Sequence, residues 1–593
     1  MPNIHTHTFP NGFRVIYERP TSPTEITHVD VFCRAGSVFE PESLRGVSHF
    51  IEHMCFKGTK RRPTTRDIFA VYDNIGAYFN AYTEKQFTCY VASFLNSHTN
   101  QCVDTLGDMM LRSKFDKREY KKELNVVLEE NVRNLTDYSN ITEDIAESLI
   151  YKGSSYAYPI DSMKYHKIVD SWDYDDVMAF YHKHYVPENM MLSIVTTIPF
   201  STILKIIKSC HFAKFDNHRD NNLRGKPLSG YSSNTVATQE RRRSHTLHSR
   251  YSRKTTPILP IMNNIVRTPI MKQEQGISVG FPEITGDCEN AVRSDKLRDK
   301  LHDKLRDKLR GRCSRNNRTW NPIRTRIELI PISNIQTAYM SIGIRTCSRF
   351  NEDKYALELL RILMGGKFTS RLTMLLREQN GLTYTSSVST THYEHSGDIS
   401  IFCITDSANI LRNNKLTQTR SNYVLPNFLE HLPRCVRCSS QSRKSLPLGL
   451  SARKTAKNRN SSYSHTPHRT LARRDRRGVF PIIMDMLRDL IRHGITDTEL
   501  RETKMYMAGI TQMNMAKGTK QAEYNGLEWF LGNDEQITPY GDLYKTKYED
   551  ITKTEINRVI RNYFTLENTN IVMVGSRLPD KKHIEKLVNG VFA

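Results

Sequence analysis

The chain has 593 residues, a length that predicts more than one domain. Hydrophobic residues make up 38% and charged residues 25%, which suits a globular protein, and no apolar run is long enough to span a membrane. The net charge of +23 would suit an anionic partner such as a nucleic acid, but residues 216–320 carry +11 and residues 407–478 carry +14. The rest of the chain is therefore close to neutral.

The N-terminus carries no sign of export. It lacks a basic segment followed by an apolar one, and it is not rich in Arg and Ser, so neither a signal peptide nor a transit peptide is expected. The eleven Cys residues are odd in number and scattered, which indicates reduced thiols rather than a disulfide framework. Together these features favour a cytoplasmic protein.

Residues 1–215 have the pattern of a mixed α and β domain. Alternating apolar residues after the Asn11-Gly12 turn predict a first strand, and two more follow. The strands are expected near 13–17, 26–33 and 191–195, and the helices near 45–55, 65–75, 99–113, 117–135 and 174–184. Residues 321–406 and 479–593 again indicate mixed α and β structure.

Two basic segments interrupt this pattern. In residues 216–320, Asp295-Lys-Leu-Arg is followed by three similar tetrapeptides, and a Leu at every fourth position builds no lasting apolar face on a helix. Residues 407–478 are rich in Ser, Arg and Lys. We expect both segments to be disordered insertions, the first as a linker between domains and the second within the C-terminal domain.

The two mixed regions are also related to each other. Val29–Ser37 aligns with Met340–Ser348 at an offset of 311 residues, and in both copies a strand ending in Ser is followed by a helix. This similarity predicts two related domains. When this alignment is continued without gaps, three polar residues of the first copy lie opposite apolar residues of the second. These pairs are His49 with Leu360, Glu52 with Leu363, and His53 with Met364. The chemistry is therefore expected in the first domain.

The sharpest local signal is His49-Phe-Ile-Glu52-His53. On a helix, two His residues four positions apart share a face and can reach one metal ion, and Glu52 lies close enough to exchange a proton with a water there. The motif alone is only suggestive, because His residues at a helix surface give the same pattern. Against that alternative, the helix carries the apolar neighbours Val47, Phe50, Ile51 and Met54. Polar side chains on a buried helix need partners, and a metal supplies one.

A catalytic zinc site needs a third protein ligand and one open position. The stretch from Glu123 to Glu130 offers that ligand, because these two residues are two helical turns apart and share a face, with Val126 and Val127 marking the buried side. We assign Glu130 to the metal and Glu123 to a place behind it, where it orients a ligand His. Glu129 is expected in solvent. Periodicity alone would more often make these acids a solvated face.

The segment from His49 to Thr59 resembles the inverted H-x-x-E-H zinc motif of the pitrilysin and insulinase metallopeptidase family, and in particular its processing-peptidase members. Three further stretches are similar in order and spacing: Gly76–Thr83 to the family's substrate-side strand, Glu123–Glu130 to its acidic helix, and Ser370–Tyr384 to its second-domain motif. The likeness covers essentially everything outside the two basic segments.

The resemblance implies an α+β fold of two homologous mixed α/β sandwich domains. Residues 1–215 would form the zinc domain, and residues 216–320 would be the basic linker. Residues 321–593, interrupted by the insertion at 407–478, would form the related domain without metal.

The resemblance also implies a zinc metalloendopeptidase with one Zn2+ per chain. His49, His53 and Glu130 would hold the zinc, Glu123 would support them, and Glu52 would be the general base. The substrate backbone would bind at Asn80 and Ala81, the latter at a sheet edge, and two residues would approach from the second domain, namely Arg377 and Tyr384, with the tyrosine donating to the oxyanion.

The expected partners follow from the same resemblance. The substrate would be a peptide or unfolded polypeptide, and the chain would form a homodimer, or a heterodimer with a related subunit, around a chamber.

One alternative is an inactive family member that serves as a structural or processing-complex subunit, but the full ligand set speaks against it. Another is nucleic-acid binding by the basic segments, which contain few aromatic residues and would bind only non-specifically. The third, a small metal knuckle at His431, Cys435 and Cys438, lacks a second Cys or His pair.

Overall fold

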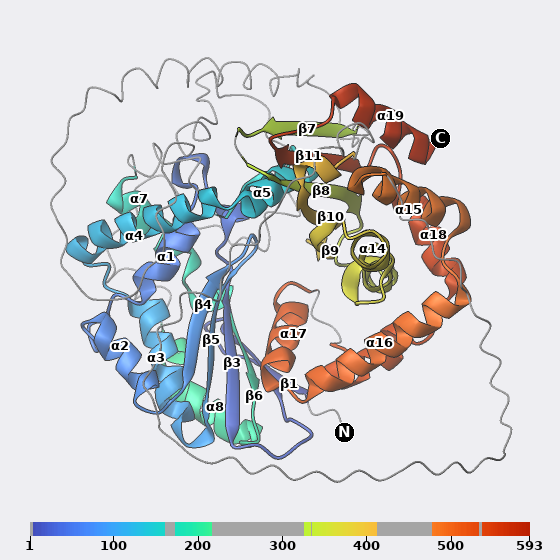
Figure 1. Cartoon of the computed structure of the whole chain (residues 1–593). Helices are drawn as coiled ribbons and strands as arrows, with labels where there is room; N and C mark the ends of the chain where they lie inside the picture. Colours follow the sequence, from blue (N-terminus) through green and yellow to red (C-terminus); the bar gives the residue numbers. More distant parts are fainter. Residues whose placement is uncertain (1–3, 161–171, 216–324, 334, 412–476, 533–536) are drawn as a thin grey trace, which may run out of the picture.

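The computed structural model describes residues 4–160, 172–215, 325–333, 335–411, 477–532 and 537–593 (Figure 1). Nearly all of the two basic segments lies outside these ranges, and so does the Cys435–Cys438 pair, so the disorder and the knuckle stay predictions. The described residues form two β-sheets with helices packed on them, which confirms the expected α+β fold of two domains. Of the described helices, none is long and apolar enough to cross a membrane.

The first sheet has six strands in the order β1-β2-β6-β3-β5-β4. The strands are β1 (Ile4–Thr8), β2 (Arg14–Glu18), β3 (Ile26–Cys33), β4 (Tyr78–Thr83), β5 (Thr88–Leu95) and β6 (Met190–Val195). All the strand pairs are antiparallel except β2 with β6. β4 lies at the edge and pairs with β5 alone, with Ala81 opposite Tyr90, so its other side is open to a further strand.

The second sheet has five strands in the order β7-β11-β8-β10-β9. The strands are β7 (Arg326–Pro331), β8 (Thr337–Thr346), β9 (Thr383–His392), β10 (Gly397–Asp406) and β11 (Thr569–Gly575). β8 lies between antiparallel neighbours, as β3 does in the first sheet. This equivalence agrees with the predicted internal repeat. The residues aligned with the H-x-x-E-H motif are buried in the apolar core, at Leu360, Leu363 and Met364.

Helices from both halves of the chain cover the two sheets. Those in the first half are α1 (Val47–Cys55), α2 (Thr65–Asp73), α3 (Thr99–Arg112), α4 (Lys117–Thr136), α5 (Tyr138–Ile150), α7 (Tyr174–His184), α8 (Phe200–Ser209) and α9 (His211–Lys214). Those in the second half are α13 (Asp353–Arg361), α14 (Arg371–Thr373), α15 (Val479–His493), α16 (Asp497–Met515), α17 (Gly518–Phe530), α18 (Lys553–Tyr563) and α19 (Lys581–Phe592). Every helix expected from the sequence is present.

Each half of the chain supplies one helix to the other half's sheet (Figure 1). α5 packs on the second sheet, where Ala146 and Leu149 are buried against Val572 of β11. α17 packs on the first sheet, where the ring of Phe530 lies 5.6 Å from that of Phe32 on β3. This exchange of helices ties the two domains together and holds the first sheet, on which α1 packs through β4 and β5.

The interface beneath α17 contains a buried acid. Asp30 on β3 is 6% exposed, and burial raises its pKa to about 8, with the charge of Glu523 acting in the same direction and that of Lys520 opposing it. In the unfolded chain the pKa of an Asp is about 3.9. Below about pH 4, Asp30 is protonated in both the folded and the unfolded chain and does not lower the free energy of unfolding. As the pH rises, the unfolded chain ionises first and the free energy of unfolding falls, until the loss is complete above about pH 8.

We expect the free energy of unfolding to fall as the pH rises from 5 to 8, and the Asp30→Asn variant to lose part of this slope. Urea unfolding of the wild type and of the Asp30→Asn variant between pH 5 and pH 8 measures how the free energy of unfolding of each depends on pH. Parallel slopes would contradict the assignment to Asp30.

Candidate metal centre

The helix that carries the H-x-x-E-H motif is fixed at its start. Gly46 precedes α1 with φ at 90°, a backbone conformation that favours glycine. The carboxylate of Glu40 accepts hydrogen bonds from the backbone N–H groups of Gly46 at 2.7 Å and Ser48 at 2.9 Å. Its negative charge also suits a helix N-terminus. These contacts set the position of His49 in the first turn.

The buried face of α1 is the one expected from the sequence. Its apolar residues have no exposed surface, namely Val47, Phe50, Ile51 and Met54. With that face in the core, the two imidazoles of the motif turn to α4, which packs alongside. The amphipathic pattern of α1 thus places both His side chains on the partly accessible side of the helix.

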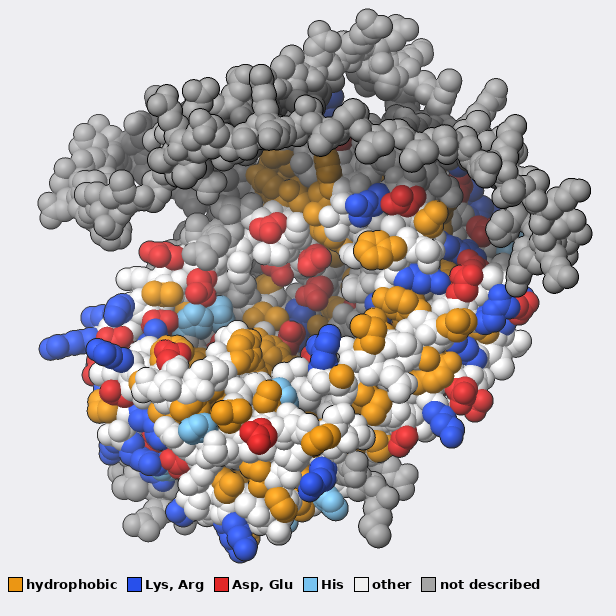
Figure 2. All heavy atoms as spheres, turned by 60° about the horizontal axis from the view of Figure 1, so that its bottom comes forward, with side chains coloured by type: hydrophobic (Ala, Val, Ile, Leu, Met, Phe, Trp, Pro, Cys, Tyr) orange, Lys and Arg blue, Asp and Glu red, His pale blue; other side chains and the backbone are white. Residues whose placement is uncertain are grey.

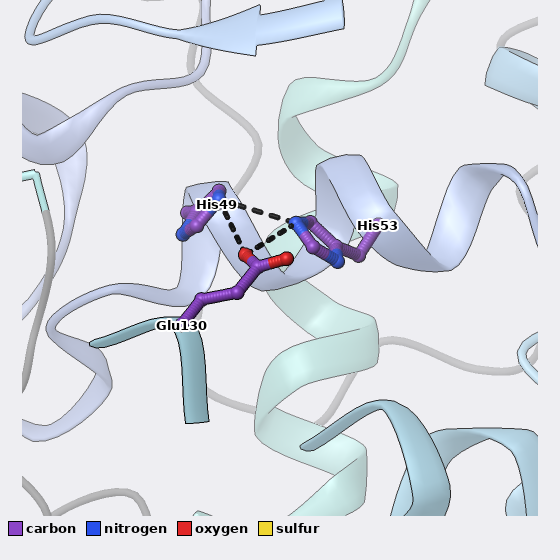
Figure 3. A group of neighbouring side chains, drawn as sticks. All are labelled: His49, His53 and Glu130. Carbon is purple, nitrogen blue, oxygen red and sulfur yellow. Dashed lines mark hydrogen bonds and ion pairs between the residues drawn. The ribbon is translucent and has the colours of Figure 1, made fainter. Parts of the chain in front are cut away.

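Three potential ligands converge between α1 and α4 (Figure 3). The Nε2 atoms of His49 and His53 lie 3.2 Å apart, and Oε2 of Glu130 lies 4.0 Å from the first and 3.4 Å from the second. Two nitrogen ligands of one tetrahedral zinc, each about 2.0–2.1 Å from it, would be about 3.3 Å apart. Two imidazoles and one carboxylate are also a donor set that zinc takes, so the residues present fit the ion.

Glu123 supports the cluster from behind. Its carboxylate accepts a hydrogen bond from Nδ1 of His53 at 2.9 Å and pairs with the Lys57 ammonium at 2.5 Å. Burial would raise the pKa of Glu123, but these two hydrogen bonds hold it below its ordinary value. Because a carboxylate can only accept, Nδ1 of His53 carries the proton, and the lone pair of Nε2 is directed to the cluster. Lys57 is a support that the sequence did not reveal.

Glu52 lies beside the cluster and is 7% exposed. Burial raises its pKa, against the lowering effects of His49 and of a hydrogen bond from the Thr83 hydroxyl, which lies 2.6 Å from Oε2. A carboxylate with a raised pKa is a better proton acceptor near neutral pH. The predicted general base therefore has a suitable environment.

The other residues of α4 partly follow the expectations. Glu129 is exposed, as expected, and Val127 is buried. Val126, which was expected on the buried side, is 37% exposed. That expectation was wrong because α4 buries the face that contains Val127, and Val126 is one position off this face.

Asn80 and Ala81 lie on β4, at the open edge of the first sheet. The side-chain oxygen of Asn80 accepts a hydrogen bond from the backbone N–H of Ala81 at 2.9 Å; Asn80 is exposed, whereas Ala81 is half-buried against the core. The next residue on the same face of the strand, Thr83, contacts Glu52. The structure therefore brings the predicted substrate strand next to the predicted base.

The two predicted residues of the second domain, Arg377 and Tyr384, are exposed. Arg377 forms an ion pair of 3.9 Å with its neighbour Glu378, and both side chains are more than half exposed. Tyr384, near the start of the edge strand β9, is 70% exposed. Figure 2 shows one face of the molecule, which is hollowed near its centre, with acidic and apolar side chains around the hollow. Neither Arg377 nor Tyr384 has a hydrogen bond or ion pair with the cluster in the part of the chain described.

Comparison with known proteins places the chain among metallopeptidases. A family profile described as Insulinase (Peptidase family M16) matches residues 14–162, which include the metal cluster. A second, described as Peptidase M16 inactive domain, matches residues 171–254 and 285–419. The first match contains the H-x-x-E-H motif, and the second covers a large part of the residues that follow.

Similar proteins include peptidases from bacteria and mitochondria. The uncharacterized zinc protease YmxG of Bacillus subtilis is 34% identical over 205 residues, which are 35% of this chain and 49% of that protein. The beta subunit of the mitochondrial-processing peptidase of Caenorhabditis elegans is 31% identical over 206 residues, which are 35% of this chain and 44% of that protein. The chain thus spans about half the length of the curated relatives it matches.

Solved structures share the whole architecture. A protease from Helicobacter pylori superposes with a TM-score of 0.63 at 15% identity, over 97% of this chain and 100% of that one. An M16 inactive domain from Pseudomonas fluorescens gives a TM-score of 0.61 at 13% identity, over 98% and 100%. At these identities the likeness concerns the fold.

Proposed function

The chain belongs to the insulinase-type M16 metallopeptidase family, and from that premise we propose that it is a zinc-dependent endopeptidase that cuts short or unstructured polypeptides. The observation that carries the proposal is the convergence of His49, His53 and Glu130, with Glu52 one residue before a ligand and buried beside it. A ligand set of this kind leaves a position open for chemistry.

The site residues divide the work of hydrolysis. His49, His53 and Glu130 hold one Zn2+ per chain, and Glu123 fixes the proton of His53. When bound by these residues, zinc would supply Lewis-acid chemistry at the site. Glu52 takes the proton of the attacking water and passes it to the leaving amine.

The substrate binds as an extended segment. β4 offers an open edge beside the cluster, and Asn80 and Ala81 lie on it. A peptide that adds to this edge pairs its backbone with the strand, which a folded protein cannot do without unfolding locally. The enzyme therefore selects for flexible chains, and hydrolysis of a quenched unstructured peptide but not of a stable folded protein tests this selection.

The last parts of the site come from a second subunit. Arg377 and Tyr384 are exposed, and among the described residues neither has a hydrogen bond or ion pair with the cluster of its own chain, which leaves their side chains accessible to a partner. There Tyr384 donates a hydrogen bond to the oxyanion and Arg377 neutralises substrate charge. The proposed assembly is a pair of two-domain subunits around a chamber, either two copies or one copy and a related chain.

A mixing experiment tests the shared site. We expect Glu52→Gln and Tyr384→Phe chains to be impaired separately and to regain activity when they are co-expressed. In the mixed dimer, the Tyr384→Phe chain keeps its own Glu52 and receives an intact Tyr384 from its partner. Peptide hydrolysis by the purified mixture measures the recovery. A mixture no more active than the sum of the two variants would place Tyr384 at the site of its own chain.

A further inference from the structure

Thr83 is the last residue of β4 and lies against the predicted general base. Its hydroxyl is 2.6 Å from Oε2 of Glu52. Residues on the same face of a strand alternate, so Thr83 shares its face with Ala81. A single strand therefore carries both the proposed peptide-binding position and a contact to the base.

The direction of this hydrogen bond is set by its neighbours. The hydroxyl of Thr88 lies 3.4 Å from that of Thr83, but it donates its own proton to the backbone oxygen of Ala35 at 2.9 Å. Thr88 thus has no proton to give to Thr83, and the Thr83 hydroxyl has one proton, which the carboxylate of Glu52 accepts. The hydrogen bond from Thr88 to Ala35 therefore leaves Thr83 as the donor and Glu52 as the acceptor.

The hydrogen bond occupies one oxygen of the carboxylate. Among the described residues, the Thr83 hydroxyl is the hydrogen-bond donor to Glu52, and it bonds to Oε2 rather than to Oε1. A buried carboxylate without hydrogen bonds would be costly and free to rotate. The bond to Thr83 limits rotation of the carboxylate and leaves Oε1 without a bond to a described residue, while the charges of His49 and His53 act on Glu52 from nearby.

We propose that Thr83 is a positioning residue for Glu52: its hydroxyl fixes the carboxylate so that Oε1 meets the attacking water. The inference rests on the proposed peptidase function and deepens it. Because Thr83 and Ala81 belong to one strand, the same element sets the place of the peptide and the orientation of the base. Catalysis is sensitive to such placement, and a displacement of about 1 Å can cost about 100-fold in rate.

The kinetic test uses the full chain loaded with zinc and a quenched unstructured peptide. Thr83→Val keeps the shape but removes the hydroxyl, and it should lower kcat by about 10- to 100-fold with KM and zinc content unchanged. Thr83→Ser should restore most of the loss. The matched control is Thr105→Val on α3, where a hydroxyl that donates to the backbone oxygen of Gln101 is removed, and its kcat should equal that of the wild type.

A second readout does not use activity. Thermal unfolding of the metal-free chain should show that Thr83→Val lowers Tm in the wild type, and lowers it less in a Glu52→Leu background, because the bond is already lost there. Equal shifts in both backgrounds would overturn the proposal, as would a Thr83→Val chain with wild-type kcat. A wild type that binds zinc and cleaves no peptide, alone or with a related subunit, would overturn the proposed function and this role together, whereas an active wild type beside an unaffected Thr83→Val overturns the role of Thr83 alone.

Discussion

Replacing Glu52 with Gln is expected to lower kcat for peptide hydrolysis by about 100- to 10,000-fold while one zinc per chain stays bound. The amide has the shape of the carboxylate and can still accept from Thr83, but it cannot take a proton from water. Because Glu52 is not among the converging ligands, the metal should be retained. Steady-state kinetics together with metal analysis of the same preparations measure both quantities.

Two results would contradict this account of Glu52. Loss of zinc from the Glu52→Gln chain would make the residue a ligand or a structural support rather than a base. Full activity with zinc bound would show that another group accepts the proton. Thermal unfolding of both chains controls for a loss of fold.

The Glu130→Gln variant is expected to lose zinc and, with it, hydrolysis down to background. Oε2 of Glu130 is the one carboxylate oxygen in the cluster, 3.4 Å from Nε2 of His53, and an amide oxygen is a weaker ligand without charge. The matched control is its neighbour Glu129, which is exposed on the same helix. Glu129→Gln should keep wild-type zinc content and activity.

Equilibrium dialysis against buffered zinc, followed by metal analysis, measures the affinity of the two variants. If Glu129→Gln lost the metal and Glu130→Gln kept it, the assignment of the third ligand would be reversed. If neither variant lost it, the carboxylate ligand would have to come from elsewhere.

The sequence predicted the elements around the site better than those that complete the sheets. The run from Ile26 to Cys33 and the helical pattern around His49 are strongly periodic, and both were placed within two or three residues. β1 was not predicted, because the sequence Ile4–Thr8 is polar and four of its five residues are exposed. The packing of α17 on the first sheet could not be predicted either, since it joins residues about 500 positions apart, such as Glu18 and Asn525.

For the candidate site, spacing was informative within an element and uninformative between elements. The i, i+4 spacing brought His49 and His53 together, and the seven-residue step from Glu123 already favoured Glu130 over Glu129, but spacing alone did not show that α4 packs on α1 and brings Glu130 to His53. Thr83 belongs to Gly76–Thr83, a stretch that resembles the substrate-side strand of the family. Its contact with Glu52, however, depends on how β4 lies against α1. In the proposed dimer, the positions of Arg377 and Tyr384 relative to the cluster would be set by a partner subunit, which one sequence does not specify.

The central claim is that this chain is a zinc-loaded hydrolase, and metal content measured beside activity tests it most directly. We predict one zinc per chain in the purified protein, cleavage of a quenched unstructured peptide, loss of cleavage on chelation and recovery when zinc is restored. A chain that takes up no zinc from buffered zinc solution would contradict the claim. Zinc at full occupancy without cleavage, by the chain alone or with a related subunit, would favour a structural role instead.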